Sequence, residues 1–439
     1  MQEKQDEQGQ ISAEEALKIG INAHRHGELD LAEEVYRRVL ATVPTYADAM
    51  HFLGVVLHQR SQSDEALALI KRSIELAPDI ADWHSNLGNV WVERGDAREA
   101  LKAYDRALEL QPGNSRVHNN RGAARNALGD FNGALDEYRR AIELDPEFVD
   151  GYMNVGNLLF RQGKTTESVR FYDEALKRNP NHYNARRMVG IAFSMQGDNE
   201  AAAEIYRRWL ADEPDNPVAR HLLAACSGEN VPDRASDELV QQLFDPFADS
   251  FDGKLEKLDY RAPQLAVDAV RRALSEPDKS LVCLDAGCGT GLCGSLLEPY
   301  SRQLVGVDLS GRMLERARIR SCYDDLVKAE LTQFLLDSER RFDLIVSADT
   351  LVYFGRLDKV LRAARAALRP GGLFVFTVEK LTEVDSAEFR LNHHGRYSHS
   401  AAYLAAVLAE AGFEQRSIEP GVLRKEAQVP VDGFVVSAR

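Results

Sequence analysis

Cysteine is scarce in this chain, and it is not arranged as in a metal site. Five of the 439 residues are cysteine, and none of them forms a CxxC pair or joins a cluster with zinc-ligand spacing. An odd number of cysteines in a long chain also favours a reducing compartment over a disulfide framework. We therefore predict no bound metal and a cytoplasmic location.

Long apolar runs and an excess of positive charge are also missing. No segment approaches the roughly 18 consecutive apolar residues of a membrane span, and the N-terminal sequence MQEKQDEQGQISAEE lacks the apolar core of a signal peptide. The formal net charge is −15, whereas binding to a nucleic-acid backbone requires a clustered basic face. We predict neither a membrane nor a nucleic acid as partner. The length favours two domains.

The first half of the chain, in contrast, contains a repeat with a period of 34 residues. Each unit has a glycine, then a small residue, a large residue four positions after it, and a proline. The glycines are Gly20, Gly54, Gly88, Gly122, Gly156 and Gly190, and the prolines are Pro44, Pro78, Pro112, Pro146, Pro180 and Pro214. Each unit reads as two amphipathic helices that approach closely at the glycine, with the large residue between units. One unit cannot bury its apolar face alone, so the units must stack into a solenoid.

The units resemble the tetratricopeptide repeat (TPR). The clearest of them reads WHSNLGNVWVERGDAREALKAYDRALELQP, and its key positions are Leu87, Gly88, Trp91, Ala100, Tyr104, Ala107 and Pro112. The resemblance implies an all-α right-handed superhelix with a concave groove. It implies a flexible N-terminus at residues 1–12, six repeats at 13–226 that start at 13, 47, 81, 115, 149 and 183, and a capping helix at 217–226.

Asparagine recurs where the resemblance places the groove. Asn86, Asn120 and Asn154 stand two positions before the glycines, and Asn89 and Asn157 stand one position after them. Asparagine is a poor helix former, so packing gives no reason to repeat it, whereas its amide can bind a peptide backbone. The ladder resembles that of O-linked N-acetylglucosamine transferase, which implies a protein or peptide partner. The alternatives are solvated side chains, or repeats that serve as a scaffold or for dimerisation.

From residue 227 the period disappears. Residues 227–239 are polar and rich in turn-forming residues, which predicts a linker, and a short apolar run at 281–284 leads into LDAGCGTG. A strand that opens into a glycine turn and then a helix is the first βα unit of a doubly wound sheet, which binds ligands at the carboxyl ends of its strands. Asp308 ends the next predicted strand, about 20 residues on, where an acid can bind ribose hydroxyls.

The turn is not a dinucleotide fingerprint, because it reads GxGxG and follows Asp285, which would repel a pyrophosphate but suits an ammonium group. Together LVCLDAGCGTGL, VGVDLSGRML, FDLIVSADTLVYF and LRPGGLFVFTVE resemble the class I S-adenosylmethionine-dependent methyltransferases. The segment FDPFADSFDGKLEKLDYRAP resembles the lid of a bacterial group of these enzymes that carries TPRs. The resemblance implies a Rossmann-like α/β domain at 240–439 with its lid at 240–263. It also implies a seven-stranded sheet of order 3-2-1-4-5-7-6, with its last hairpin near Phe413–Ile418 and Gly433–Ser437.

The resemblance further implies a site for S-adenosylmethionine (SAM). Asp285 and the glycines would contact the methionyl part and Asp308 the ribose, while Glu330 would read the adenine amine. The methyl group would point towards Asp349–Tyr353. The predicted cofactor-binding residues are Asp285, Gly287, Cys288, Gly289, Gly291, Asp308, Leu309, Met313, Glu330, Leu331 and Asp349.

Candidate catalytic residues lie on segments expected to close over the methyl group. They are Tyr353, His394, Arg396 and His399, with Tyr260 as a further candidate. An oxygen or nitrogen acceptor must lose its proton, and Arg396 could clamp a substrate carboxylate. The alternatives are that His399 and Ser400 only begin a helix, with Ser400 as its cap, and that the tyrosines only pack around the cofactor.

These features predict a SAM-dependent methyltransferase that acts on an N, O or S atom of a protein or peptide delivered by the TPR groove. A second hypothesis keeps the enzyme but gives it a small-molecule or carrier-bound acid and uses the repeats for assembly. A third is a non-enzymatic adaptor. The intact Asp285, glycines and Asp308 argue against the third hypothesis.

Overall fold

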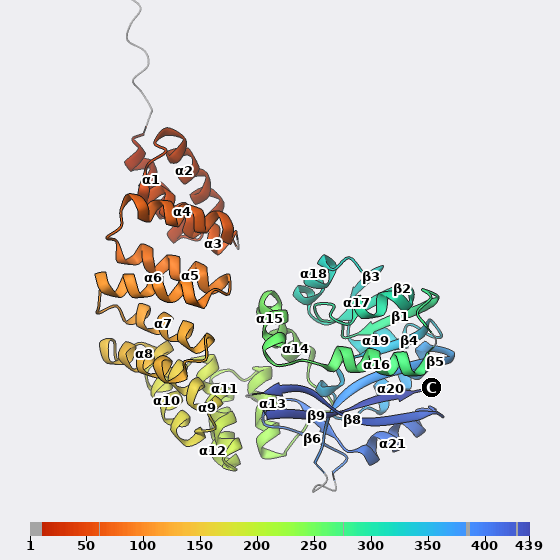
Figure 1. Ribbon diagram of the computed structural model, residues 1–439. Coiled ribbons are helices and arrows are strands. Elements are labelled where there is room, and N and C mark those ends of the chain that lie inside the picture. The colour runs from red at the N-terminus through yellow and green to blue at the C-terminus, as the bar shows by residue number, and fades with distance from the viewer. Residues whose placement is uncertain (1–10, 61, 275, 383–386, 427–428) are drawn as a thin grey trace, which may run out of the picture. The chain divides into compact units, whose positions relative to one another are not determined.

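The structure, a computed structural model, describes residues 11–439 except 61, 275, 383–386 and 427–428. Residues 1–10 of the predicted flexible N-terminus therefore lie outside the described residues. The chain divides into two compact units, Met1–Ala185 and Arg186–Arg439, and both can be followed in Figure 1.

The first unit is a stack of helix pairs, one pair for each of the first five repeats (Figure 1). The first helix of each pair begins where the sequence places the start of a repeat. The pairs are α1 (Ala13–Arg25) with α2 (Leu29–Thr42), α3 (Ala47–Gln59) with α4 (Ser63–Leu76), α5 (Ala81–Glu93) with α6 (Ala97–Leu110), α7 (Ser115–Ala127) with α8 (Phe131–Leu144), and α9 (Val149–Arg161) with α10 (Thr165–Arg178).

The repeated glycines stand where the two helices of one repeat meet. A Cβ built on Gly88 would collide with the ring of Tyr104, which is fully buried, and the same collision recurs in all six repeats, with Ile70 in place of tyrosine in the second. The close approach predicted at the glycines is therefore confirmed. The large residue fills space inside its own repeat as well as between repeats, since the ring of Tyr36 also stacks on Phe52 of the next repeat at 6.0 Å.

The second unit begins with most of the sixth repeat and continues through the sheet to the C-terminus. Its strands are β1 (Leu281–Ala286), β2 (Ser301–Asp308), β3 (Asp325–Lys328), β4 (Phe342–Ser347), β5 (Leu368–Lys380), β6 (Phe389–Leu391), β7 (Tyr397–His399), β8 (Arg416–Glu426) and β9 (Val429–Ala438). Its helices are α11 (Tyr183–Met195, which crosses the boundary), α12 (Asn199–Asp212), α13 (Pro217–Ser227), α14 (Asp237–Phe244), α15 (Phe251–Lys257), α16 (Ala262–Ala273), α17 (Gly294–Leu297), α18 (Gly311–Ile319), α19 (Leu331–Leu336), α20 (Asp358–Ala367) and α21 (Ala401–Glu410). Three 3-10 turns, η1 (Asp245–Ser250), η2 (Glu298–Tyr300) and η3 (Leu351–Tyr353), complete it.

The sheet has the predicted order. Strands β3, β2, β1, β4 and β5 run parallel, β9 pairs antiparallel with β5, and β8 pairs with β9 in the place of the outer strand. The last hairpin is longer than predicted, because β8 reaches Glu426 and β9 begins at Val429. Phe413 precedes β8 and is buried in the core.

The predicted number of seven strands is wrong, because the described residues form a nine-stranded sheet. The two additional strands, β6 and β7, form a hairpin at the end of β5. β5 continues past Phe376, its last residue paired with β4, and β7 pairs with that extension at Glu379 and Lys380. The hairpin thus gives unpaired backbone groups of β5 a hydrogen-bonding partner.

Helices cover both faces of the sheet. The cluster on one face includes Val267 of α16 and Leu297 of α17, and the cluster on the other includes Leu335 of α19, Leu361 of α20 and Leu404 of α21. Strands buried on both faces read as continuous apolar runs, which explains LVCL in β1. Both faces are therefore occupied, and the carboxyl ends of the parallel strands are the place for a ligand.

Candidate active site

Three glycines shape the turn after β1, and they have different tasks. Gly287 has a φ of +76°, and a Cβ there would collide with Thr350, while Gly291 has a φ of +88° and a Cβ there would lie 2.9 Å from the ring of Tyr323. Gly289 has a φ of +54° and open space where its Cβ would stand. Packing therefore requires the two outer glycines, and Gly289 is the point where a ligand can approach the backbone.

The turn holds the carboxylate of Asp308, at the end of β2, in a fixed position. The N–H of Gly289 donates to its Oδ2 at 2.9 Å, and the N–H of Ser310 donates to its Oδ1 at 2.8 Å. Burial raises the pKa of Asp308, and these backbone donors oppose that shift. Each oxygen retains capacity for another donor, so this carboxylate can accept hydrogen bonds from two hydroxyls beside the open glycine.

Glu330 presents an unused acceptor to the same space. Its Oε2 accepts the N–H of Gln333 at 2.8 Å and so caps α19. Its Oε1 is buried and has no hydrogen-bond partner among the described residues, the nearest cation being Arg234 Nε at 3.9 Å. A buried acceptor without a partner costs about 1–3 kcal/mol. A ligand donor such as the adenine amine would satisfy it.

Asp285 is the most deeply buried carboxylate at the turn, and only 1% of its surface is exposed. The hydroxyl of Tyr323 donates to its Oδ2 at 2.6 Å. Burial nevertheless raises the pKa of Asp285 to about 7. A buried carboxylate with this pKa favours a cationic ligand group, because the cation replaces the lost hydration of the charged form.

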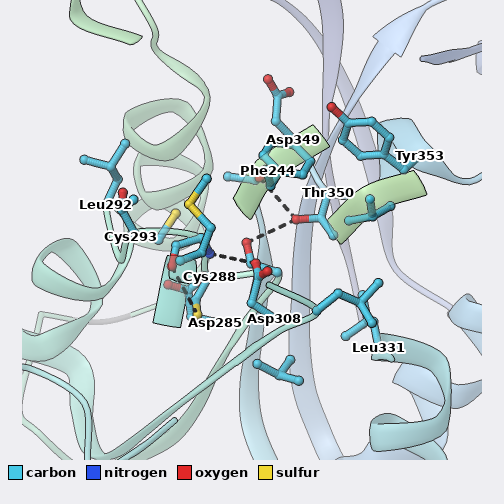
Figure 2. Close-up of a pocket in the computed structure, with 18 of the residues that line it drawn as sticks. Phe244, Asp285, Cys288, Leu292, Cys293, Asp308, Leu331, Asp349, Thr350 and Tyr353 are labelled. Carbon is cyan, nitrogen blue, oxygen red and sulfur yellow. Dashed lines mark hydrogen bonds between the residues drawn. The ribbon is translucent and has the colours of Figure 1, made fainter. Parts of the chain in front are cut away.

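These residues line one cavity of about 970 Å³, part of it open to solvent. Figure 2 shows Asp285 and Asp308 close together, with Asp349 and Tyr353 beyond them. Of the eleven predicted cofactor-binding residues, ten line the cavity and one, Gly291, does not. The structure thus gathers the predicted set into one space, and the role of each member stays a prediction.

The predicted lid is tied to the rim of this cavity by three aspartates. Ser310 Oγ donates to Asp245 at 2.5 Å, and Arg312 pairs with Asp249 at 3.0 Å. Asp252 accepts from Thr290 Oγ1 at 2.5 Å and pairs with Arg320. The rings of Phe244 and Phe251, on the same segment, line the cavity. The segment thus forms an apolar wall of the cavity, held in place by ionic and polar contacts.

Part of the predicted linker also belongs to the site. The backbone of Asp233 and Ala235 exchanges hydrogen bonds of 2.8 Å with Gly355 and Tyr353, and Arg234 lines the cavity. No pattern in the sequence marks this pairing, because it joins two segments that are more than a hundred residues apart and neither of which forms a strand.

Tyr353 and Tyr260 both line the cavity. The ring of Tyr353 meets that of Phe244 edge-on at 5.6 Å. Burial raises the pKa of both phenols, so both stay neutral at ordinary pH. They can donate a hydrogen bond to a substrate, but a neutral phenol is a poor base for removing a proton from the substrate.

The predicted catalytic residues His394, Arg396 and His399 do not line the cavity. His399 is fully buried on β7, where its Nε2 lies 3.0 Å from the carbonyl oxygen of Gly355 and its ring stacks on Tyr403. Ser400 accepts the N–H of Tyr403 and caps α21. These contacts favour the alternative hypothesis, in which His399 and Ser400 have a structural role and not a catalytic one.

His394 and Arg396 reach the cavity only through other residues. Arg396 Nε donates to Glu379 at 2.6 Å and Nη2 to Glu426 at 2.6 Å, so two carboxylates of the chain already occupy its guanidinium. His394 Nε2 lies 3.6 Å from Glu379. Burial lowers the pKa of His394 to about 3, so the ring is neutral. This arrangement therefore does not favour a direct contact between Arg396 and a substrate carboxylate.

Sequence reasoning missed Arg424, Glu379 and Glu426, which connect those residues to the cavity. Arg424 donates from Nη1 to Asp349 Oδ2 at 2.6 Å and from Nε to Glu426 at 2.8 Å, and it also pairs with Glu379. Arg424 and Glu379 are each only 4% exposed. Buried charges of this kind in alternation with apolar residues on β5 and β8 were the available signal.

The predicted asparagine ladder is joined by side-chain hydrogen bonds between consecutive repeats. Asn120 Nδ2 donates to Asn89 at 3.1 Å, and Asn154 Nδ2 donates to Asn119 at 2.8 Å. Asn86 Nδ2 lies 3.1 Å from His51 Nε2. These amides are partly buried rather than fully solvated.

Asn89 and Asn157 have an additional structural task. They accept the hydroxyls of the buried Tyr104 at 2.8 Å and Tyr172 at 3.0 Å. The expectation that packing gives no reason for asparagine is therefore wrong at these two positions, because a buried hydroxyl needs a partner. The peptide-binding role of the ladder stays a prediction.

The described part of the chain lacks two features that would have pointed to other functions. No helix there is both long enough and apolar enough to cross a membrane. No group of three or more His, Cys, Asp or Glu side chains among those residues could hold a metal ion.

Comparison with protein families identifies both parts of the chain. Residues 258–418 match a methyltransferase domain. Tetratricopeptide-repeat families match residues 17–81, 81–114, 122–163 and 154–217.

Individual relatives each match a part of the chain. Human methyltransferase-like protein 27 is 38% identical over 144 residues, which is 32% of this chain and 58% of that protein. The ubiquinone biosynthesis O-methyltransferase of Brucella melitensis biotype 2 is 32% identical over 111 residues, 24% of this chain and 44% of that protein. The chain thus spans about half the length of the curated relatives it matches. Among solved structures, PilW, a type IV pilus biogenesis factor, aligns with 49% of this chain and all of its own at 16% identity, with a TM-score of 0.45.

The mostly parallel sheet, the glycine turn and the family match define the C-terminal part as a methyltransferase domain. The same chain carries multiple tetratricopeptide repeats ahead of that domain. It is therefore a methyltransferase-domain protein with N-terminal TPRs.

Proposed function

We propose that this protein is a SAM-dependent methyltransferase. The observation that carries the proposal is the cavity at the carboxyl ends of β1, β2 and β4, which brings together the open Gly289, the fixed Asp308 and the unpartnered Oε1 of Glu330. Each feature supplies what one part of SAM requires. Gly289 allows close approach, Asp308 accepts from ribose hydroxyls, and Glu330 accepts from the adenine amine. Asp285 suits the methionyl ammonium.

SAM supplies an electrophilic methyl group when bound, so the chain has only to bind, orient and keep water out. The lid rings and Tyr260 exclude water from the cavity, and a dry site strengthens the interactions with Asp285 and Asp349. The phenol groups of Tyr260 and Tyr353 can orient an acceptor through hydrogen bonds. A carboxylate is the remaining group of the cavity that can take a proton from an oxygen or nitrogen acceptor.

We propose that the acceptor atom belongs to a protein or peptide bound by the repeats. TPRs point to protein–protein interaction, and hydrogen bonds between consecutive repeats join Asn120 to Asn89 and Asn154 to Asn119 in the first unit. Amides can bind a peptide backbone without regard to its side chains.

A small-molecule oxygen acceptor is the second candidate. The walls contributed by Phe244, Phe251, Tyr260 and Tyr353 are aromatic, and they would suit a flat apolar acceptor. The similarity to ubiquinone biosynthesis O-methyltransferases adds support for an oxygen atom. In this case the repeats serve assembly.

The first test is an isothermal titration of the wild type and Asp308→Ala with SAM. We expect micromolar binding to the wild type and at least a hundredfold loss in the variant, because two ribose contacts disappear. Asp325→Ala, at the start of the neighbouring β3 and outside the cavity, is the matched control and should bind as the wild type does. Absence of binding to the wild type would favour the adaptor hypothesis.

The second test identifies the acceptor class with methyl-labelled SAM in a cell lysate. Label in a protein band that is lost with Asn86→Ala, Asn120→Ala and Asn154→Ala together would support the peptide groove, provided that SAM affinity and thermal stability are retained. Label in the small-molecule fraction that survives the triple change would favour the second candidate.

A further inference from the structure

The side chain of Asp349 is held at the cavity from two sides. It follows β4 directly and has a φ of +54°, a left-handed conformation that L residues adopt at a cost. Its N–H donates to Thr377 Oγ1 at 2.8 Å, and its Oδ2 accepts from Arg424 at 2.6 Å. Figure 2 shows the carboxylate at the cavity together with Tyr353 and Thr350. Neighbouring strands, rather than the local chain, therefore fix where this carboxylate lies.

Arg424 is itself fixed by carboxylates on three sides. It contacts Asp349, Glu379 and Glu426, and Arg396 contacts the last two as well. Burial alone would raise the pKa of Glu379, but the guanidinium groups of Arg396 and Arg424 hold it below its usual value. The guanidinium therefore cannot turn away from Asp349 without leaving a buried charge unpaired.

The same group of residues is supported from the opposite side by the end of the repeat region. The ring of His221 on α13 lies 2.9 Å, through Nε2, from the carbonyl oxygen of Gly395, the residue before Arg396. The hydroxyl of Tyr397 donates to the carbonyl oxygen of Pro232 at 2.7 Å. All of these residues belong to the second unit, so the hairpin that carries Arg396 is firmly placed.

We propose that Arg424 is a positioning residue of this site, one that keeps the Asp349 carboxylate ionised and turned into the cavity, where it faces a cationic group of bound SAM. The inference rests on the proposed function, because it needs SAM in this cavity. The residue after Asp349, Thr350, joins this segment to the glycine turn, since its Oγ1 donates to Gly287 O at 3.2 Å. Asp285 and Asp349 both line the cavity, so two carboxylates are available to the cationic part of SAM.

The charge of Asp349 depends on Arg424 more than on Arg396 or Thr377, which also oppose its protonation. The titratable or charged groups that face Asp349 are Arg424 from β8, Glu379 from β5, Arg396 from the hairpin, Tyr260 before α16, Tyr353 in η3 and Cys293 before α17. Burial raises the pKa of Asp349, and Arg424 is the first of the groups that lower it. Burial also raises the pKa of Tyr260, Tyr353 and Cys293. These three stay neutral, so the loss of Arg424 lets Asp349 take a proton.

The chain contains a matched control for this ion pair. Arg369 Nη1 lies 2.6 Å from Asp343 Oδ2, the same atoms and the same distance as in the pair of Arg424 with Asp349. Asp343 stands at the start of β4 and Asp349 just beyond its end. The pair at Arg369 lies outside the cavity lining. Arg369→Met therefore removes an ion pair of the same geometry, although a more exposed one, without touching the site.

The experiment is calorimetric titration of the full chain with SAM from pH 6 to pH 9. We expect Arg424→Met to bind about tenfold more weakly than the wild type at pH 7, with the ratio approaching one as pH rises, because one unit of pKa is a tenfold change in proton occupancy. Arg369→Met should show a ratio near one at every pH. Arg424→Lys should recover part of the loss, and Arg424→Met should cost nothing further in an Asp349→Asn background.

S-adenosylhomocysteine (SAH), which lacks the sulfonium charge, then identifies the cation. A loss confined to SAM assigns Asp349 to the sulfonium, and an equal loss for both assigns it to the ammonium. A loss in Arg424→Met that does not change with pH, or that Arg369→Met reproduces, overturns the proposal while SAM binding by the wild type stands. If Arg424→Met does not fold, its combination with Glu379→Gln removes one buried acid and gives the same comparison.

Discussion

Polar side chains are held in opposite ways in the two units of this molecule. In the repeats, partners lie one helix or one repeat apart, as with Asn120 and Asn89 or Tyr104 and Asn89. In the second unit, Arg424 contacts Asp349, 75 residues away, and Asp285 contacts Tyr323, 38 residues away. A contact that recurs with the repeat period can be recognised by comparing one repeat with the next. A contact that depends on strand order has no such counterpart elsewhere in the sequence.

The largest effect should come from the packed interior of the repeats. Tyr104→Ala leaves a cavity opposite Gly88, and such truncations cost about 3–5 kcal/mol. We expect urea unfolding of the first unit to shift by that amount while the SAM affinity of the second unit stays unchanged. A parallel loss of SAM affinity would contradict this expectation.

A smaller effect distinguishes structure from peptide binding at Asn89. Asn89→Ala leaves the buried hydroxyl of Tyr104 without its acceptor, at a cost of about 1–3 kcal/mol. Tyr104→Phe in the same chain should restore most of this free energy of unfolding, since the unsatisfied hydroxyl is gone. If the double variant is no more stable than Asn89→Ala alone, the hydrogen bond is not the reason for the asparagine.

The pH dependence of SAM affinity tests Asp285. Its pKa is raised to about 7 in the protein without ligand, and a cationic ligand group prefers the ionised carboxylate. Affinity should therefore rise with pH up to about 7 and level off above it, with about tenfold loss per unit at lower pH. Calorimetry on the wild type and Asp285→Asn measures this, and the asparagine variant should bind weakly without that slope.

The smallest effect is expected at the lid. Asp252→Asn weakens the contacts with Arg320 and Thr290, and exposed ion pairs contribute about 0.2–1 kcal/mol. SAM should dissociate two- to fivefold faster in stopped-flow displacement, and added salt should reduce the difference. Asp268→Asn, which removes a surface ion pair with Arg271 on α16, is the control and should leave the rate unchanged.

The sequence allowed more to be predicted where its patterns are local. The glycines, the turn and Asp308 are close in the chain, and ten of the eleven residues that the resemblance predicted for cofactor binding line one cavity. Glu379, Arg424 and the docked segment at Arg234 were not predicted, because each acts through a partner on another strand. His399 was proposed for the site from its neighbours in sequence, yet all three residues of β7 are buried and His399 contacts Gly355 and Tyr403 instead.

The sequence by itself determined the repeat length, because a period is visible within short segments. Through its resemblance to known families it also implied the two kinds of domain and the order of the main sheet. The tertiary structure decided the number of strands and the buried ion network around Asp349. It also decided that most of the sixth repeat belongs to the second compact unit rather than to the first. The physical reason is that burial and pairing of charges depend on which strand ends meet, and that information is spread across the whole second unit.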